Sequence, residues 1–158
     1  KQLVEGIRWV AVQNIHLTLR FLGNLDDGQI LRVRRAVMAG AEGTPPFTLR
    51  PGSLGGFPDL RRPRVLYVNL DGDIETLKRL QSRIEDELFK SDFSKQDKPF
   101  SPHVTIGRVR RGRRALWNAP TIPIQSTSDT LVSEILILKS DLRPEGPVYT
   151  PLARTVLG

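Results

Sequence analysis

The chain contains no cysteine. This absence excludes disulfide bonds, a thiol nucleophile and every zinc site that depends on cysteine ligands. No apolar run approaches the roughly 20 residues that a membrane-spanning helix needs, and the first residues contain no secretory hydrophobic region. We therefore expect a cytoplasmic protein that has no membrane partner.

Several common catalytic signatures are also missing. The sequence has no G-x-S-x-G, no G-x-x-x-x-G-K-[ST] and no G-x-G-x-x-G, which weakens the serine hydrolase, nucleotidase and dehydrogenase interpretations. It has no H-E-x-x-H motif, and a zinc site would need a third or fourth protein ligand beyond its histidines. The sequence thus predicts an activity that uses neither a metal nor a cofactor.

Histidine is scarce, and both copies lie in the same four-residue frame. His16-Leu17-Thr18-Leu19 and His103-Val104-Thr105-Ile106 each alternate a polar residue with an apolar one. In a strand, residues i and i+2 project from the same face, so each frame places an imidazole beside a hydroxyl while its apolar residues point into a core. One isolated histidine in a strand is most simply a structural residue. Two histidines in matched frames instead favour one shared catalytic site.

The rest of the pattern predicts an α+β fold in one domain of 158 residues. Helices are expected at residues 26–41 and 73–90, with Asp26 and Asp73 as N-caps. The glycine-rich segment Pro51–Pro58 is interpreted as a turn. Mostly antiparallel strands are expected at Ile7–Val12, Ile15–Leu22, Phe47–Leu54, Arg64–Leu70, His103–Val109, Leu131–Leu138 and Val148–Val156.

Two imidazoles and two hydroxyls suit chemistry at a phosphodiester. Because histidine titrates near neutrality, one neutral and one protonated ring can act as base and acid at the same pH. The threonine hydroxyls can donate to the non-bridging oxygens. The net charge of +7, from 24 Lys+Arg against 17 Asp+Glu, favours a nucleic acid or another acidic partner, although a merely solubilising surface would look the same.

Blocks along nearly the whole chain resemble one family. They are Arg8-Trp9-Val10, the segment from Asn14 to Gly23, Phe57-Pro58 with Arg62 to Leu66, the segment from Pro99 to Val109, and the segment from Gly146 to Leu152. Together they are similar to the 2H phosphoesterase superfamily, and in particular to the RNA 2′,3′-cyclic phosphodiesterases, also called 2′-5′ RNA ligases.

The resemblance implies two pseudo-symmetric lobes, each an antiparallel sheet with packed helices, around a central cleft. It also implies hydrolysis of an RNA or nucleoside 2′,3′-cyclic phosphate to a 2′-phosphate without metal, with reversible 2′-5′ ligation in some members. His16 would be the proton donor, His103 the proton acceptor, and Thr18 and Thr105 the phosphate-binding residues. The family's opening strand and helix are expected to be missing, because Lys1 to Val4 resemble only the tail of that helix.

The expected partner is RNA or a nucleotide with a 2′,3′-cyclic phosphate end, tRNA fragments included, bound by a monomer. Alternatives are another cyclic or 2′-5′-linked nucleotide as substrate, and a non-catalytic RNA-binding module. Arg108, Arg110 and Arg111 are candidate RNA contacts, and Tyr149 and Phe57 could stack on a base. Simple alternation places Arg108 on the face opposite His103, unless a bulge near Gly107 changes the parity.

Overall fold

The computed structural model describes residues 6–110, 129–144 and 146–158, which form two compact units. Unit 1 comprises, of the described residues, 6–18, 50–72 and 102–110, and unit 2 comprises 19–49, 73–101, 129–144 and 146–158. Antiparallel strands and two packed helices confirm the α+β class predicted from the sequence. The expectation of one bilobal domain stays a prediction, and Lys1 to Val4 lie outside the described residues.

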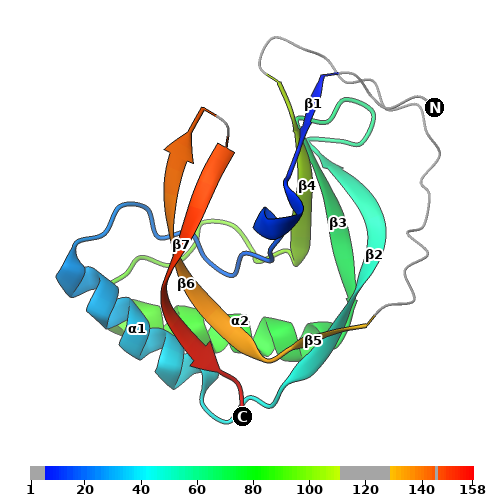
Figure 1. Cartoon of the computed structure of the whole chain (residues 1–158). Helices are drawn as coiled ribbons and strands as arrows, with labels where there is room; N and C mark the ends of the chain where they lie inside the picture. The colour runs from blue at the N-terminus through cyan, green and yellow to red at the C-terminus, as the bar shows by residue number, and fades with distance from the viewer. Residues whose placement is uncertain (1–5, 111–128, 145) are drawn as a thin grey trace. The chain divides into compact units, whose positions relative to one another are not determined.

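Unit 1 is built around strand β4, His103–Val109, with the bounds that the sequence predicts. It pairs antiparallel with β1, Ile7–Trp9, on one side and with β3, Val65–Gly72, on the other (Figure 1). The next strand beyond β3 is β2, Phe47–Phe57, most of which belongs to unit 1. Ile7 and Leu66 are buried together at the centre of this unit's core.

The glycine-rich segment Pro51–Pro58 is not the turn that the sequence predicts, because β2 continues through it to Phe57. Gly55 lies directly against the ring of Tyr67 in β3, and a β-carbon at this position would overlap that ring. Glycine within a strand commonly marks such a close approach. The glycine pattern therefore records strand packing here rather than chain reversal.

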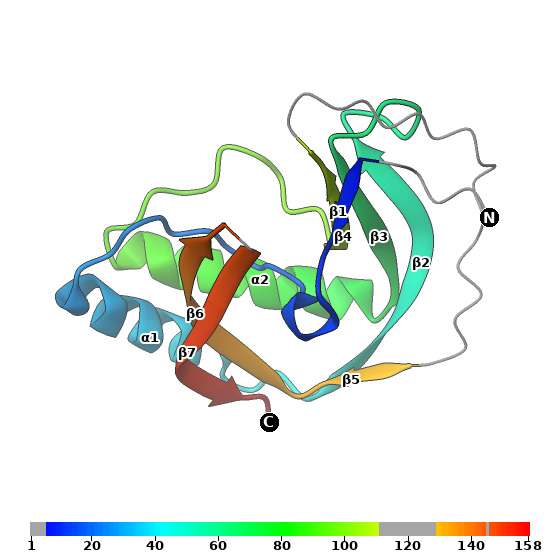
Figure 2. The ribbon, with the colours of Figure 1, turned by 45° about the horizontal axis from the view of Figure 1, so that its top comes forward.

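Unit 2 contains both α-helices of the described residues, which lie side by side (Figure 2). Helix α1, Asp27–Ala41, begins with a capping box in which Asp26 and Gln29 bond reciprocally to each other's backbone N–H. Helix α2, Ile74–Lys90, follows Asp73, but this side chain does not cap it. The Asp73 carboxylate instead accepts the backbone N–H of Thr48 at 2.9 Å, so the N-cap prediction holds for Asp26 only.

The remaining strands of unit 2 are antiparallel pairs. Strand β5, Thr130–Val132, pairs with the first three residues of β2, and β6, Glu134–Arg143, pairs with β7, Gly146–Val156. The single strand predicted at Leu131–Leu138 is therefore wrong, because it is interrupted at Ser133. The carbonyl of Ser133 accepts the backbone N–H of Leu157 at 2.9 Å, outside the ladders of the named strands.

The predicted strand Ile15–Leu22 is also not formed, since only Leu17 makes a strand-type bridge. The chain that follows is held by side chains instead. Arg20 Nη1 contacts Glu85 Oε2 of α2 at 3.3 Å, and only 12% and 13% of the two side chains are exposed. Arg20 also donates to the carbonyl of Ser94. This ion pair fixes the segment directly after Thr18 to helix α2 within unit 2.

We predict that Glu85→Ala lowers the free energy of unfolding by about 3 kcal/mol, because it leaves the Arg20 charge buried without its carboxylate. The matched control is Asp86→Ala on the same helix, whose ion pair with Lys95 is more than half exposed. That variant should cost less than about 1 kcal/mol. Urea unfolding followed by circular dichroism measures both values, and equal losses would contradict a special role for the buried pair.

Candidate active site

The two histidine frames meet in unit 1, where a single strand-type bridge joins them. Leu17 forms an antiparallel bridge with Val104 of β4. In an antiparallel pair the neighbours of bridged residues also face one another, so His16 lies opposite Thr105 and Thr18 lies opposite His103. Directly opposed residues have β-carbons about 5 Å apart, and the diagonal positions of the two histidines are separated by about 7 to 8 Å. The bridge brings together all four predicted site residues.

These four residues, the His/Thr quartet, share one face of the sheet. Leu17 and Val104 occupy the opposite face, where Val104 pairs with the buried Val68 of β3. Each member of the quartet is half-buried, so a small ligand can reach the side chains. An antiparallel pair has a local two-fold axis between its strands, and the matched frames therefore make the quartet pseudo-symmetric.

The ring of His16 is oriented by the turn that precedes it. The 3₁₀ helix η1, Val12–Asn14, ends with the Asn14 carbonyl oxygen 2.7 Å from His16 Nδ1. A carbonyl can only accept a hydrogen bond, so Nδ1 is the nitrogen that donates. Sequence reasoning did not identify this contact, because the acceptor is a backbone atom whose direction depends on the turn.

The ring of His103 packs against Tyr67 of β3. The two ring centroids are 5.1 Å apart and the planes are inclined by 59°. Tyr67 lies opposite Thr105 in the sheet, and Asn69, opposite His103, donates to Ser53 Oγ at 3.0 Å. Sequence reasoning missed Tyr67. The sequence signal for Tyr67 was its position between Leu66 and Val68. Both of these residues are buried, so alternation places Tyr67 on the other face of the strand, which is the face of the quartet.

Arg108 lies on the same face as the quartet. Simple alternation from His103 predicts the opposite face, and a bulge accounts for the difference. Leu66 pairs with Gly107 but Tyr67 pairs with Thr105, so Ile106 is an extra residue in β4. This bulge reverses the alternation beyond it. Val65 pairs with Arg108 and shares the face of Tyr67, and Arg108 in turn pairs with Arg8 of β1.

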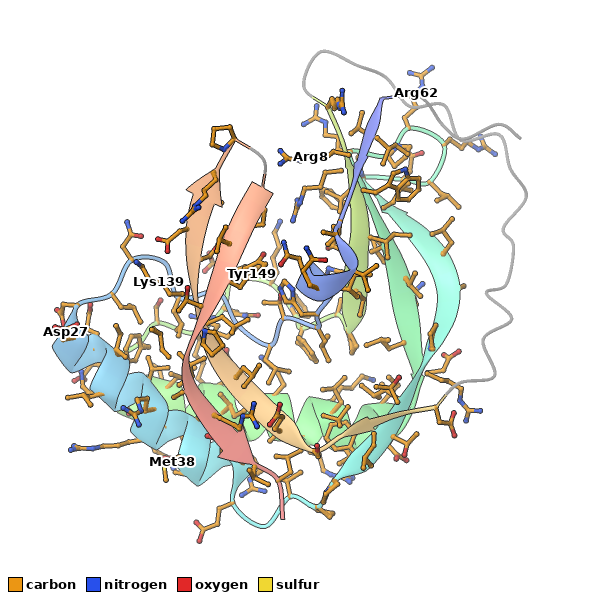
Figure 3. The ribbon with its side chains drawn as sticks, in the orientation of Figure 1. Arg8, Asp27, Met38, Arg62, Lys139 and Tyr149 are labelled. Atoms are coloured by element: carbon orange, nitrogen blue, oxygen red, sulfur yellow. The ribbon has the colours of Figure 1, made fainter. Side chains whose placement is uncertain are left out.

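The other predicted RNA-binding residues that the structure describes lie outside strand β4 and the first histidine frame. Arg110 is exposed, and its backbone N–H donates to the Gly6 carbonyl at 2.8 Å. Phe57 ends β2 with 60% of its surface exposed. Tyr149 lies on β7 in unit 2, as labelled in Figure 3. Arg111, with Arg113 and Arg114 of the same basic segment, lies outside the described residues.

Within residues 6–110, 129–144 and 146–158, no three His, Cys, Asp or Glu side chains gather in an arrangement that could hold a metal ion. No helix in this described part of the chain is long and apolar enough to cross a membrane.

Comparison with known proteins identifies the family of this chain. A family model described as the 2'-5' RNA ligase superfamily matches residues 6–139. The RNA 2',3'-cyclic phosphodiesterase of Aquifex aeolicus is 31% identical over 154 residues, which cover 96% of this chain and 82% of the relative. The enzyme of the same name from Methanothermobacter thermautotrophicus is 31% identical over 149 residues, which cover 92% and 80% of the two chains.

Two solved structures extend the comparison to the fold. The protein TT0787 of Thermus thermophilus matches with a TM-score of 0.80 at 26% identity, over 97% of this chain and 83% of that one. E. coli LigT complexed with 3'-AMP matches with a TM-score of 0.78 at 27% identity, over 97% and 82%. The chain therefore belongs to the 2'-5' RNA ligase superfamily, within the 2H phosphoesterases.

Proposed function

We propose that this protein hydrolyses the 2′,3′-cyclic phosphate at the end of an RNA or a nucleotide to a 2′-phosphate, with the His/Thr quartet as its active site. The bridge between Leu17 and Val104 is the observation that carries the proposal, because it collects two imidazoles and two hydroxyls on one sheet face. The relatives named RNA 2',3'-cyclic phosphodiesterase support the substrate class.

In the proposed reaction a water oxygen attacks phosphorus in line with the bond to the 3′ oxygen. His103 accepts a proton from that water as the new P–O bond forms. His16 donates a proton from Nε2 to the 3′ oxygen as the old P–O bond breaks. The products are a 2′-phosphate and a 3′-hydroxyl, and each histidine ends in the protonation state in which the other began.

The hydroxyls of Thr18 and Thr105 stabilise the transition state in this mechanism. Each hydroxyl lies directly opposite one imidazole and two residues along its own frame from the other, so each can donate to a non-bridging phosphate oxygen whose charge must be held during displacement. The same site supports 2′-5′ joining when an RNA 5′-hydroxyl replaces water as the nucleophile. The leaving group is again the 3′ oxygen, and the reverse step regenerates the cyclic phosphate.

The proposed substrates are RNA ends, tRNA fragments included, and the proposed active form is a cytoplasmic monomer. Arg108 and Arg110 are proposed to contact the RNA backbone, with Arg111 beyond the described residues in the same role. Phe57 and Tyr149 are proposed stacking surfaces for a base.

We expect His16→Ala and His103→Ala each to reduce hydrolysis of 2′,3′-cyclic nucleotides by about 100-fold to 10,000-fold, because each removes a proton-transfer group. Thr18→Val and Thr105→Val should reduce it by about 100-fold through loss of one donor. Phosphorus NMR of the products in EDTA measures the rate and identifies the 2′-phosphate.

Thr48→Val is the matched control for the threonine variants, because Thr48 is a strand residue of unit 2 outside the quartet. Its activity should equal that of the unmodified protein. Robust hydrolysis by both histidine variants would contradict the two-histidine mechanism, and loss of the wild-type activity in EDTA would show that a metal participates.

The pH dependence of kcat/KM should be bell-shaped, since the reaction needs one neutral imidazole and one protonated imidazole. Activity should fall at low pH as the base becomes protonated and at high pH as the acid loses its proton. Initial rates between about pH 5 and 9 test this prediction, a range that spans the titration of histidine. A rate that rises to a plateau and does not fall would show that only the base titrates.

Charge reversal in Arg110→Glu should weaken binding of longer RNA and flatten the dependence of affinity on salt, because fewer counterions are released. Fluorescence anisotropy with labelled RNA at several salt concentrations measures both effects. An unchanged salt slope would assign Arg110 to solvated surface.

A further inference from the structure

The positive charge of the protein is concentrated in unit 1. With histidine counted as neutral, its described residues contain seven arginines, two aspartates and no lysine, a net charge of +5. The described residues of unit 2 contain 13 basic and 13 acidic residues, and their ion pairs include Arg20–Glu85 and Arg154–Glu134. The excess charge of the sequence therefore belongs mainly to the unit that holds the quartet.

Three of these seven arginines lie in one loop of unit 1. Residues 58–64, here called the arginine loop, join β2 to β3 and contain Arg61, Arg62 and Arg64. All three side chains are exposed, and none of them forms an ion pair with another described residue. Figure 3 shows the Arg62 side chain extending from the loop away from the sheet.

The single carboxylate of the loop binds the backbone instead of the guanidinium groups. Asp59 Oδ1 accepts the backbone N–H of Arg61 at 2.8 Å and that of Arg62 at 3.0 Å. Asparagine and aspartate stabilise tight turns in this way. The contact fixes the backbone from which both arginine side chains project, while their charges stay available to a ligand.

The loop is also anchored to the body of unit 1. Leu60 packs against the buried core of this unit, and the backbone N–H of Arg64 donates to the Phe57 carbonyl at 2.7 Å. A β-carbon on Gly56 would lie 2.9 Å from the Leu60 Cα, so the loop packs directly on the end of β2. A surface held in this way loses little conformational entropy when a ligand binds to it.

Strand β3 connects the arginine loop to the quartet. Tyr67 lies opposite Thr105, and Arg64 is three residues from Tyr67, which corresponds to about 10 Å along a strand. The N–H of Val109 donates to the Arg64 carbonyl at 2.9 Å, so Arg110 lies at the same end of the sheet. The loop is therefore beyond the quartet, in reach of nucleotides that precede the terminal one.

The residue types favour single-stranded RNA over an acidic protein as the partner. A guanidinium group donates two parallel hydrogen bonds to the oxygens of a phosphate. Phe57, directly before the loop, is 60% exposed and offers a ring on which a base can stack. Cationic side chains next to an exposed aromatic ring are the combination that binds single-stranded nucleic acids.

We propose that the arginine loop binds the sugar–phosphate backbone of single-stranded RNA on the 5′ side of the terminal nucleotide whose cyclic phosphate the quartet holds. This inference rests on the proposed function. It names an RNA chain, rather than a mononucleotide, as the preferred substrate, because only a chain reaches both the quartet and the loop.

The first test compares adenosine 2′,3′-cyclic phosphate with an RNA of about eight nucleotides that ends in the same group, a length typical of single-strand binding sites. At low salt the wild-type protein should prefer the RNA by about tenfold or more in kcat/KM, because charge-assisted hydrogen bonds are added. In the double variant Arg61→Gln/Arg62→Gln this ratio should fall toward one. The loss should appear in KM rather than kcat, since the contact is equal before and during reaction.

The matched control is the double variant Arg34→Gln/Arg35→Gln. These two neighbours on α1 in unit 2 are also exposed and form no ion pair within the described part of the chain, so the control removes the same charge. It should keep the wild-type activity and the wild-type ratio. An unchanged ratio in Arg61→Gln/Arg62→Gln, an equal loss in the control, or no preference in the wild type overturns the proposal.

A binding measurement separates the loop from catalysis. Fluorescence anisotropy follows a labelled RNA of the same length that ends in a 2′-phosphate, at several salt concentrations. The slope of log affinity against log salt should be less steep by about 1.4 in Arg61→Gln/Arg62→Gln, the value for two lost phosphate contacts on a single strand. The control variant, in contrast, should keep the wild-type slope.

The two proposals fail in different ways. If the wild type hydrolyses neither substrate, the proposed function fails, and the salt slope still decides whether the loop binds RNA. Equal slopes for the wild type and Arg61→Gln/Arg62→Gln would overturn the proposal for the loop. Displacement of the labelled RNA by polyglutamate as readily as by unlabelled RNA would also overturn it, because the loop would then accept any acidic chain.

Discussion

The antiparallel contact between Leu17 and Val104 is the constraint on which the candidate site depends. Each histidine frame alone offers one imidazole and one hydroxyl at positions i and i+2. Pairing the two frames at their central apolar residues places each histidine opposite the other frame's threonine and turns all four toward one face. A shift of one residue would reverse this face for one frame, so register, rather than composition, creates the quartet.

The bulge at Ile106 has a comparable effect on the cationic residues. Without the extra residue, alternation would place Arg108 on the core side, away from His103. Gly107 permits the close packing at this point, because a β-carbon there would come within 2.9 Å of Ile7 Cγ2 and 3.2 Å of Trp9 Cε3. One irregularity thus extends the polar face from the quartet to Arg108 while the apolar core of unit 1 remains packed.

The sequence predicted correctly those helices and strands that are determined by residues close together in the chain. Helices α1 and α2 begin within one residue of their predicted starts, because an apolar stripe and a short acidic segment define each of them. The strand His103–Val109 has its predicted bounds. Predictions failed where distant residues decide: β2 continues through its glycines because Tyr67 packs on Gly55, and Asp73 bonds to Thr48 instead of capping α2.

The sequence by itself predicted the four residues of the quartet and the sharing of a face within each frame, since alternation in extended chain is a property of neighbouring residues. It also indicated the family through the motif blocks. Only the tertiary structure decided that the two frames are adjacent, that Tyr67 and the Asn14 carbonyl contact the imidazoles, and that Arg108 rejoins the face of the quartet. The physical reason is that pairing partner, register and bulge position depend on packing between segments far apart in the chain, which periodicity within one segment does not encode.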